Sequence, residues 1–177
     1  MNHLLKLALP LLALVLIGCD ESRVYVHHAE ERDTGRDFVP ALKAFHIIDT
    51  YGVDTALDPG EPLTFDPYYD AGLFEVDWRV NSLEDYQISV RVNDRASIQD
   101  SQEIYTEICG EGLSCDQEAI RLCQYYPDLT MACGLDEQVT DISLQIHTLP
   151  QKLYTFLEVC DLDSNYCEYD YYPVWVE

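Results

Sequence analysis

Cysteines are the residues of this chain whose type and spacing could do the most chemistry. Seven occur among 177 residues, one at position 19 and six nearer the C-terminus. An even set of six indicates a disulfide framework if the chain is exported. Zinc binding is the rival use, but no C-x-x-C pair occurs and the histidines lie elsewhere. We therefore predict disulfides among Cys109, Cys115, Cys123, Cys133, Cys160 and Cys167.

Turn residues between these cysteines favour local pairs. A hairpin centred on Asp163-Ser164 places the last two cysteines directly opposite each other, and a loop at 127–129 does so for the third and fourth. The first two then remain for each other. Sequence alone normally cannot choose among the pairings of six cysteines, so connectivity among the first four stays open here. The favoured bonds are Cys160 to Cys167, Cys123 to Cys133 and Cys109 to Cys115.

The other candidate metal sites lack a required feature. Residues 161–165 (DLDSN) match the start of an EF-hand-like calcium loop, but Tyr166 stands where the loop needs glycine and Glu168 comes too early. An Asp- and Ser-rich hairpin tip is the ordinary interpretation. His27-His28 and the two glutamates that follow lie in a polar segment that would not pre-organise ligands. We therefore predict no metal and no cofactor.

Catalytic motifs are missing from the sequence. It contains no G-x-S-x-G, H-E-x-x-H or phosphate-binding glycine loop. His147 is the one histidine in the clearest strand region, and it has no evident nucleophile partner. We expect no catalytic residue and no enzymatic activity.

A short apolar segment precedes the first cysteine. It runs from 4 to 17, with Lys6 and His3 near its start, and it is shorter than the roughly 20 residues that a membrane-spanning helix needs. Its end, LIGC at 16–19, resembles the lipobox of bacterial lipoprotein signal peptides. The resemblance implies that 1–18 is a signal peptide, that a diacylglyceryl group is attached to Cys19, and that cleavage follows Gly18.

This resemblance implies a location as well. A chain with two or more acyl groups is held firmly by a membrane, so we expect a protein anchored through Cys19 in the bacterial cell envelope and facing the periplasm. Asp20 resembles the residue that retains lipoproteins in the inner membrane of enteric bacteria. Because that rule varies between lineages, the choice between inner and outer membrane stays open.

The strong negative charge of the chain limits the classes of molecule that could bind it. The full chain has a formal charge of −23, and loss of the signal peptide, whose one charged residue is Lys6, makes it −24. Such a surface repels nucleic acid and anionic lipid headgroups. A soluble surface is the ordinary use of this charge, and a basic protein partner or a divalent cation is the functional alternative.

Sequence character changes near residue 40. Residues 20–36 are polar, mixed in charge and without apolar periodicity, so we predict a flexible tether over 19–39 and one domain over 40–177. Alternating apolar and polar residues at 74–80 and 86–92 predict half-buried strands, as do shorter runs at 44–51, 63–65 and 142–146. A short helix is predicted at 115–122, where Ser114 could cap it. This pattern indicates an all-β antiparallel sandwich with disulfide-clamped hairpins.

Two motifs resemble fibronectin type III and related immunoglobulin-like domains. Leu73-x-x-Val76-x-Trp78 is similar to the strand that carries a core tryptophan, and the segment from Leu149-Pro150 to Tyr154 is similar to the corner whose tyrosine hydroxyl bonds the backbone. The resemblance implies a buried Trp78 and a buried, hydrogen-bonded Tyr154. Glu158 departs from the apolar phase of that strand, and a bulge near 156–157 would restore it.

Tyrosines suggest where a partner would bind. Thirteen occur, and four of them mix with acidic residues on the last predicted strand. Tyrosine also suits half-buried strands, which accounts for most of them. The chain is thus predicted to be a lipid-anchored, non-catalytic binding or structural module for an envelope protein; the alternatives are a small-ligand or cation carrier and an envelope enzyme. Its candidate partner surface comprises Tyr166, Tyr169, Asp170, Tyr171 and Tyr172.

Overall fold

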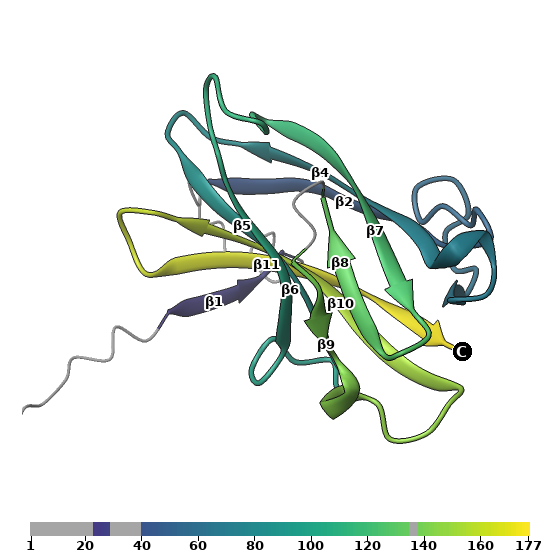
Figure 1. Ribbon diagram of the computed structural model, residues 1–177. Coiled ribbons are helices and arrows are strands. Elements are labelled where there is room, and N and C mark those ends of the chain that lie inside the picture. Colours follow the sequence, from purple (N-terminus) through teal and green to yellow (C-terminus); the bar gives the residue numbers. More distant parts are fainter. Residues whose placement is uncertain (1–22, 29–39, 135–137) are drawn as a thin grey trace, which may run out of the picture.

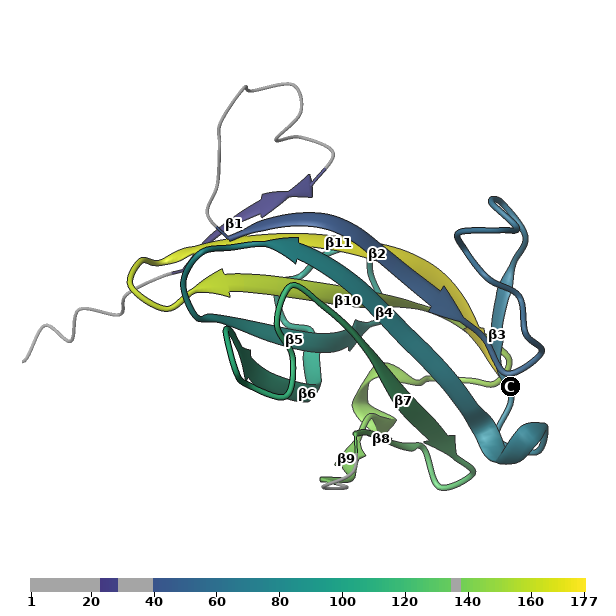
Figure 2. The same ribbon diagram turned by 90° about the horizontal axis from the view of Figure 1, so that it is seen from above.

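The computed structural model describes residues 23–28, 40–134 and 138–177. Two β-sheets contain nearly all of the regular structure, and Figure 1 and Figure 2 show their arrangement. The first sheet has the order β1 (Val24–His27), β11 (Tyr166–Val176), β10 (Gln151–Asp161), β5 (Tyr86–Asn93) and β6 (Gln102–Cys109), with β3 (Leu63–Phe65) also beside β11. The second has the order β2 (Ala41–Ile48), β4 (Leu73–Asn81), β7 (Glu118–Tyr126), β8 (Thr130–Cys133) and β9 (Thr140–Asp141).

Strand pairing is antiparallel except where β1 and β3 run parallel to β11. The all-β sandwich prediction is confirmed. Its order, with β2-β4-β7 in one sheet and β11-β10-β5-β6 in the other, is compatible with an immunoglobulin-like domain. No helix within the described ranges has the length and apolar character needed to cross a membrane.

Both predicted hairpin registers are confirmed. Cys160 lies opposite Cys167 in the β10–β11 pair, and Cys123 lies opposite Cys133 in the β7–β8 pair. Each of these pairs is a disulfide, and the third bond closes the loop between β6 and β7. The two hairpin bonds therefore clamp neighbouring strands, as the turn residues predicted.

Inward side chains of both sheets form one core. Trp78 on β4 is fully buried, as its motif implied, and it shares the core with Ile88 and Val90 on β5 and Leu157 on β10. Successive side chains of a strand point to opposite faces, which explains why the period of two in the sequence identified β4 and β5.

Two local predictions are wrong. Residues 118–126 form β7 instead of continuing a helix from 115, because their own alternation lets them pair with β4. The predicted strand at 142–146 is mostly the 3-10 helix η2 (Ser143–Gln145). There Ile142 is buried but Leu144 is 83% exposed, so apolar alternation does not mark a buried face.

The tether and corner predictions also need correction. Residues 24–27 form β1, which the polar composition of the segment did not indicate. Tyr154 points outward and packs edge-on against Tyr171, and its hydroxyl has no backbone partner among the described residues. Strand β10 runs without a bulge, so Leu153, Leu157 and Val159 face the core in a continuous register. The core-facing residues of β10 are thus offset by one position from those of a tyrosine corner, in which Tyr154 itself would face the core.

Candidate binding surfaces

A cavity lies beside β7, between this strand and β6. Its volume is about 570 Å³. We call it the β7 cleft, and it is lined by Leu73, Tyr105, Glu107, Ser114, Ile120, Arg121, Leu122, Cys123, Gln124, Tyr126, Ala132 and Gly134.

The cleft exists because β8 is much shorter than β7. Strand β8 pairs only with residues 123–126 of β7, and one further bond joins the Gly134 N–H to the Leu122 carbonyl at 3.0 Å. No described strand pairs with residues 118–122 on that side. Ile120 and Leu122 are 59% and 51% exposed there. This half of β7 is therefore an open sheet edge flanked by apolar side chains.

Backbone N–H and C=O groups alternate in direction along β7, which shows which of them point to the open edge. The Val80 N–H donates to the Gln117 carbonyl at 2.7 Å, so odd-numbered residues of β7 direct their backbone groups toward β4. The backbone groups of Glu118 and Ile120 then point away from β4. The Ile120 carbonyl accepts a bond from Arg121 Nη1 at 3.0 Å.

An ion pair forms the floor of the cleft. Arg121 Nη2 lies 2.7 Å from Glu107 Oε2, and the side chains of Arg121 and Glu107 are 17% and 14% exposed. The Glu107 carboxylate also accepts bonds from Tyr105 and Ser114, and the Arg121 guanidinium lies 5.6 Å from the centroid of the Trp78 ring. These contacts fix both charges in place.

Their titration follows from these contacts. Burial by itself would raise the pKa of Glu107, but hydrogen bonds from Ser114, Tyr105 and Arg121 outweigh it and hold that pKa below its ordinary value. Burial would lower the pKa of Arg121, and the bonds to Tyr105 and Glu107 reverse this and raise it. Both groups are therefore charged near neutral pH, and Glu107 has no proton to donate.

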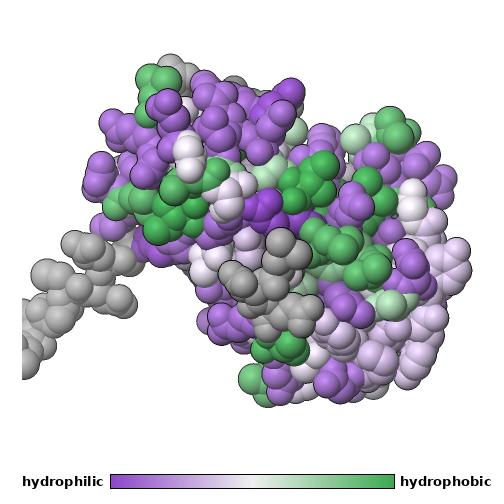
Figure 3. Space-filling view, turned by 45° about the horizontal axis from the view of Figure 1, so that its top comes forward, coloured by the Kyte–Doolittle hydropathy of each residue, from purple (hydrophilic) through white to green (hydrophobic). Residues whose placement is uncertain are grey.

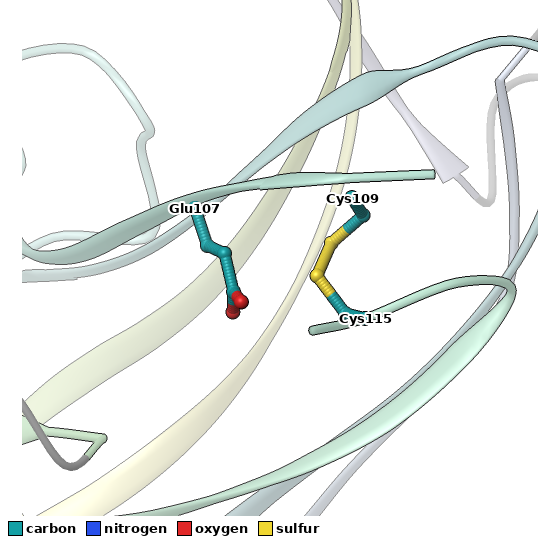
Figure 4. A group of neighbouring side chains, drawn as sticks. All are labelled: Glu107, Cys109 and Cys115. Atoms are coloured by element: carbon teal, nitrogen blue, oxygen red, sulfur yellow. A yellow bond between two sulfur atoms is a disulfide. The ribbon is translucent and has the colours of Figure 1, made fainter. Parts of the chain in front are cut away.

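Two carboxylates lie beside disulfides at distances that could suggest metal sites. Glu107 neighbours Cys109 and Cys115, as Figure 4 shows, and Glu158 neighbours Cys160 and Cys167. The sulfur atoms of each cysteine pair are bonded to each other, so no thiolate is available as a ligand. Neither group is suited to hold a metal in this state.

Histidine and hairpin motifs have local roles. Asp161 accepts bonds from the Asp163 N–H at 3.0 Å and the Ser164 hydroxyl at 2.7 Å, which closes the β10–β11 turn. The calcium-like segment therefore forms an ordinary Asx-type turn. His147 Nε2 lies 3.3 Å from Asp94 Oδ2 on the surface.

The five residues of the predicted partner surface do not share one face. Tyr169 and Tyr171 point outward from the first sheet, whereas Asp170 and Tyr172 alternate to the other side. The Tyr172 ring lies 5.3 Å from that of Phe45, and burial raises the pKa of its phenol. Tyr166 lies at the exposed end of β11. That these residues contact a partner stays a prediction.

Tyr169 and Tyr171 belong to an aromatic cluster that the sequence did not reveal. Tyr171 lies 5.3 Å from both Phe156 and His27, measured between ring centroids, and Tyr154 packs beside it. The period of two within β11 could have separated inward from outward residues. Pairing with β10 followed from the turn at 163–164, but pairing with β1 was not indicated by the sequence.

Beside this cluster, the N-terminal segment is tied to the first sheet by charge. The fully buried Glu158 carboxylate lies 3.3 Å from both Arg23 Nη1 and Arg91 Nη1. His27 pairs with Asp170 at 3.3 Å, and His28 contacts Glu168. Burial first, and then Glu158, raise the pKa of the Tyr25 phenol.

One face of the molecule is mostly polar. On the face in Figure 3, hydrophilic residues dominate and hydrophobic residues form several separate groups.

Gly18 and Cys19, the predicted cleavage and lipidation residues, lie outside the described residues. No protein-family model matches the chain, and no curated protein matches it.

Proposed function

We propose that this chain is a lipid-anchored protein of the bacterial cell envelope whose β-sandwich, of the immunoglobulin-like class, binds a partner protein and catalyses no reaction. The segment at 16–19 supports the anchor, and the strand order supports the class. The observation that carries the binding role is the β7 cleft, with its open strand edge and exposed Ile120 and Leu122.

An extended segment is the occupant that this edge suits. Backbone groups of an added strand bond the open edge, while alternate side chains of the segment contact the flanking surface. Ile120 and Leu122 lie on one face of β7, so they would contact apolar side chains of the added strand. The fixed Arg121–Glu107 pair would border its opposite face.

Charge favours a basic segment. Glu111, Asp116 and Glu118 are exposed at or just before the open edge. They attract lysine or arginine beside the apolar residues of the segment. A second copy of this chain would bring the same acidic residues against themselves, so the proposed occupant is a different protein.

Site-specific photo-crosslinking in intact envelopes tests the proposal. A photoreactive residue at position 120 should capture a protein through an extended segment. One at Ile108 should not, because Ile108 is 52% exposed on the outer face of β6, whereas its neighbour Glu107 lines the cleft. A synthetic peptide of the mapped segment should bind the purified protein. Methylation of its backbone N–H groups should abolish binding in one alternating phase only, because an added strand uses every second N–H.

Variants provide the matched comparison. Ile120→Lys should weaken peptide binding by about tenfold or more, equivalent to roughly 1.4 kcal/mol, and Ile108→Lys should leave it unchanged. Equal binding by both variants, or tolerance of methylation in both phases, would reject strand addition at β7.

The anchor has a separate test. Cys19→Ser should leave an unprocessed precursor that takes up no radioactive palmitate, because the lipobox requires the thiol. Normal processing and labelling of this variant would rule out the lipoprotein assignment.

A further inference from the structure

We infer that the end of the sandwich formed by Val24, Leu162 and Tyr166 rests on a zwitterionic lipid surface. The far end, where β11 finishes, then points away from the membrane. This inference rests on the proposed anchor at Cys19, and it assigns an orientation to the anchored protein.

Chain length brings this end to the membrane. Five residue steps separate Cys19 from Val24, and an extended chain covers at most about 3.6 Å per residue, so β1 begins within about 18 Å of the anchor. Strand β11 has 11 residues and is about 36 Å long. The tether is thus only about half as long as the sandwich.

Contacts of β1 keep the tether short. The Val24 N–H donates to the Asn165 carbonyl at 2.6 Å, and β1 then runs parallel to β11 from Tyr166 to Tyr169. Arg23 is held by the buried Glu158 at 3.3 Å. The anchored chain therefore joins the sandwich directly at the β10–β11 turn.

Exposed apolar side chains gather at that point. Val24, Leu162 and Tyr166 are 45%, 45% and 47% exposed, and Val24 is the direct register partner of Tyr166. Figure 1 shows the start of β1 beside the β10–β11 hairpin, at the end of the molecule opposite the C-terminus. Tyrosine is enriched where proteins meet lipid headgroups, since its ring is apolar and its hydroxyl is polar.

Charge selects the lipid. Asp161 and Asp163 lie in the same turn, and the mature chain is strongly acidic. These charges oppose an anionic surface but not a zwitterionic one. Phosphatidylethanolamine or phosphatidylcholine headgroups are therefore the surface that this end fits.

Tryptophan fluorescence tests the orientation. The full-length gene is expressed in a bacterium, and the processed protein is purified from membranes, checked for acyl mass at Cys19, and reconstituted into phosphatidylcholine vesicles. Leu162→Trp adds a reporter at the inferred contact. Leu57→Trp is the matched control, because Leu57 is 78% exposed in the loop between β2 and β3, at the far end.

Lipids brominated on their acyl chains should remove most of the emission added at position 162 and none of that added at position 57. Vesicles rich in phosphatidylglycerol should reduce the quenching at 162. An acylated protein whose two reporters respond equally would overturn the orientation and leave the proposed function intact. A protein without acyl mass at Cys19 would overturn both.

Discussion

Replacing Arg121 by Met removes one half of the ion pair in the β7 cleft and keeps much of the length of the side chain. The partners are only 17% and 14% exposed, and their closest atoms are 2.7 Å apart. Loss of one partner of a buried pair costs about 3–5 kcal/mol, because the other charge is left without compensation. Some water reaches the cleft, so we expect the unfolding free energy to fall by about 3 kcal/mol, the low end of this range.

Thermal and urea denaturation followed by circular dichroism, without reductant, measure this loss. For a chain of this length each kcal/mol shifts Tm by roughly 2–4 °C, so the expected decrease is about 6–12 °C. Replacing both partners, Arg121→Met with Glu107→Leu, should recover most of it, because two apolar side chains leave no unpaired charge.

The pH dependence supplies a second measurement. The pKa of Glu107 is lower in the folded protein than its ordinary value of 4.5. Stabilisation from a carboxyl with a lowered pKa is present above the unfolded pKa and is lost as the pH falls through the folded pKa. The difference in unfolding free energy between wild type and Arg121→Met should therefore shrink as the pH falls below about 4.5.

Two results would refute this reasoning. If the effects of Arg121→Met and Glu107→Leu simply add to within about 0.5 kcal/mol, the two side chains are not coupled. If the difference between wild type and Arg121→Met persists unchanged in acid, the lost energy comes from packing against neighbouring side chains instead of charge.

Three further changes test the backbone, the outer face and the hairpin clamps, each by the same denaturation assays. Gly72→Ala should reduce the unfolding free energy at least twice as much as Gly52→Ala. Both glycines have a positive φ, which costs any other residue about 1–2 kcal/mol. Only at Gly72 would the added Cβ also lie 2.0 Å from a backbone oxygen of β7. Equal losses would contradict this close approach. Tyr154→Phe should change the unfolding free energy by less than about 0.5 kcal/mol, since the Tyr154 hydroxyl has no backbone partner among the described residues. A larger loss would support a hydrogen-bonded tyrosine corner. Replacing Cys160 and Cys167 together by Ala should cost about 2.5 kcal/mol, the loop entropy of a short hairpin, and an unchanged midpoint would show that the turn needs no clamp.

Local signals in the sequence predicted the hairpins, the central strands and the disulfides. Turn residues at 127–129 and 163–164 set the register of their hairpins, so opposing cysteines followed by counting. Alternation identified β4 and β5 because each has one core face and one more exposed face. These features depend on residues close together in the chain.

Tertiary pairing decided the rest. Segment 118–126 contains both a helix signal and a strand pattern, and the partner strand β4 selects the strand. β1 forms in a polar segment because it pairs with the edge of β11 and because Arg23 and His28 contact the buried carboxylates of Glu158 and Glu168. These partners lie more than a hundred residues away in the chain. The composition of the segment therefore gave no indication of its pairing with β11 or of its contacts with these carboxylates.

The candidate sites depend on relations that no single segment contains. The β7 cleft arises from the unequal lengths of β7 and β8 and from the approach of β6, which brings Glu107 to Arg121. The tyrosines of β11 divide between two faces, so a cluster in sequence is not a cluster in space. Sequence alone thus determined the central strands β4 and β5 and the two hairpin clamps, because these depend on short-range periodicity and turn residues. The open edge and the end nearest the anchor depend on which distant strands meet.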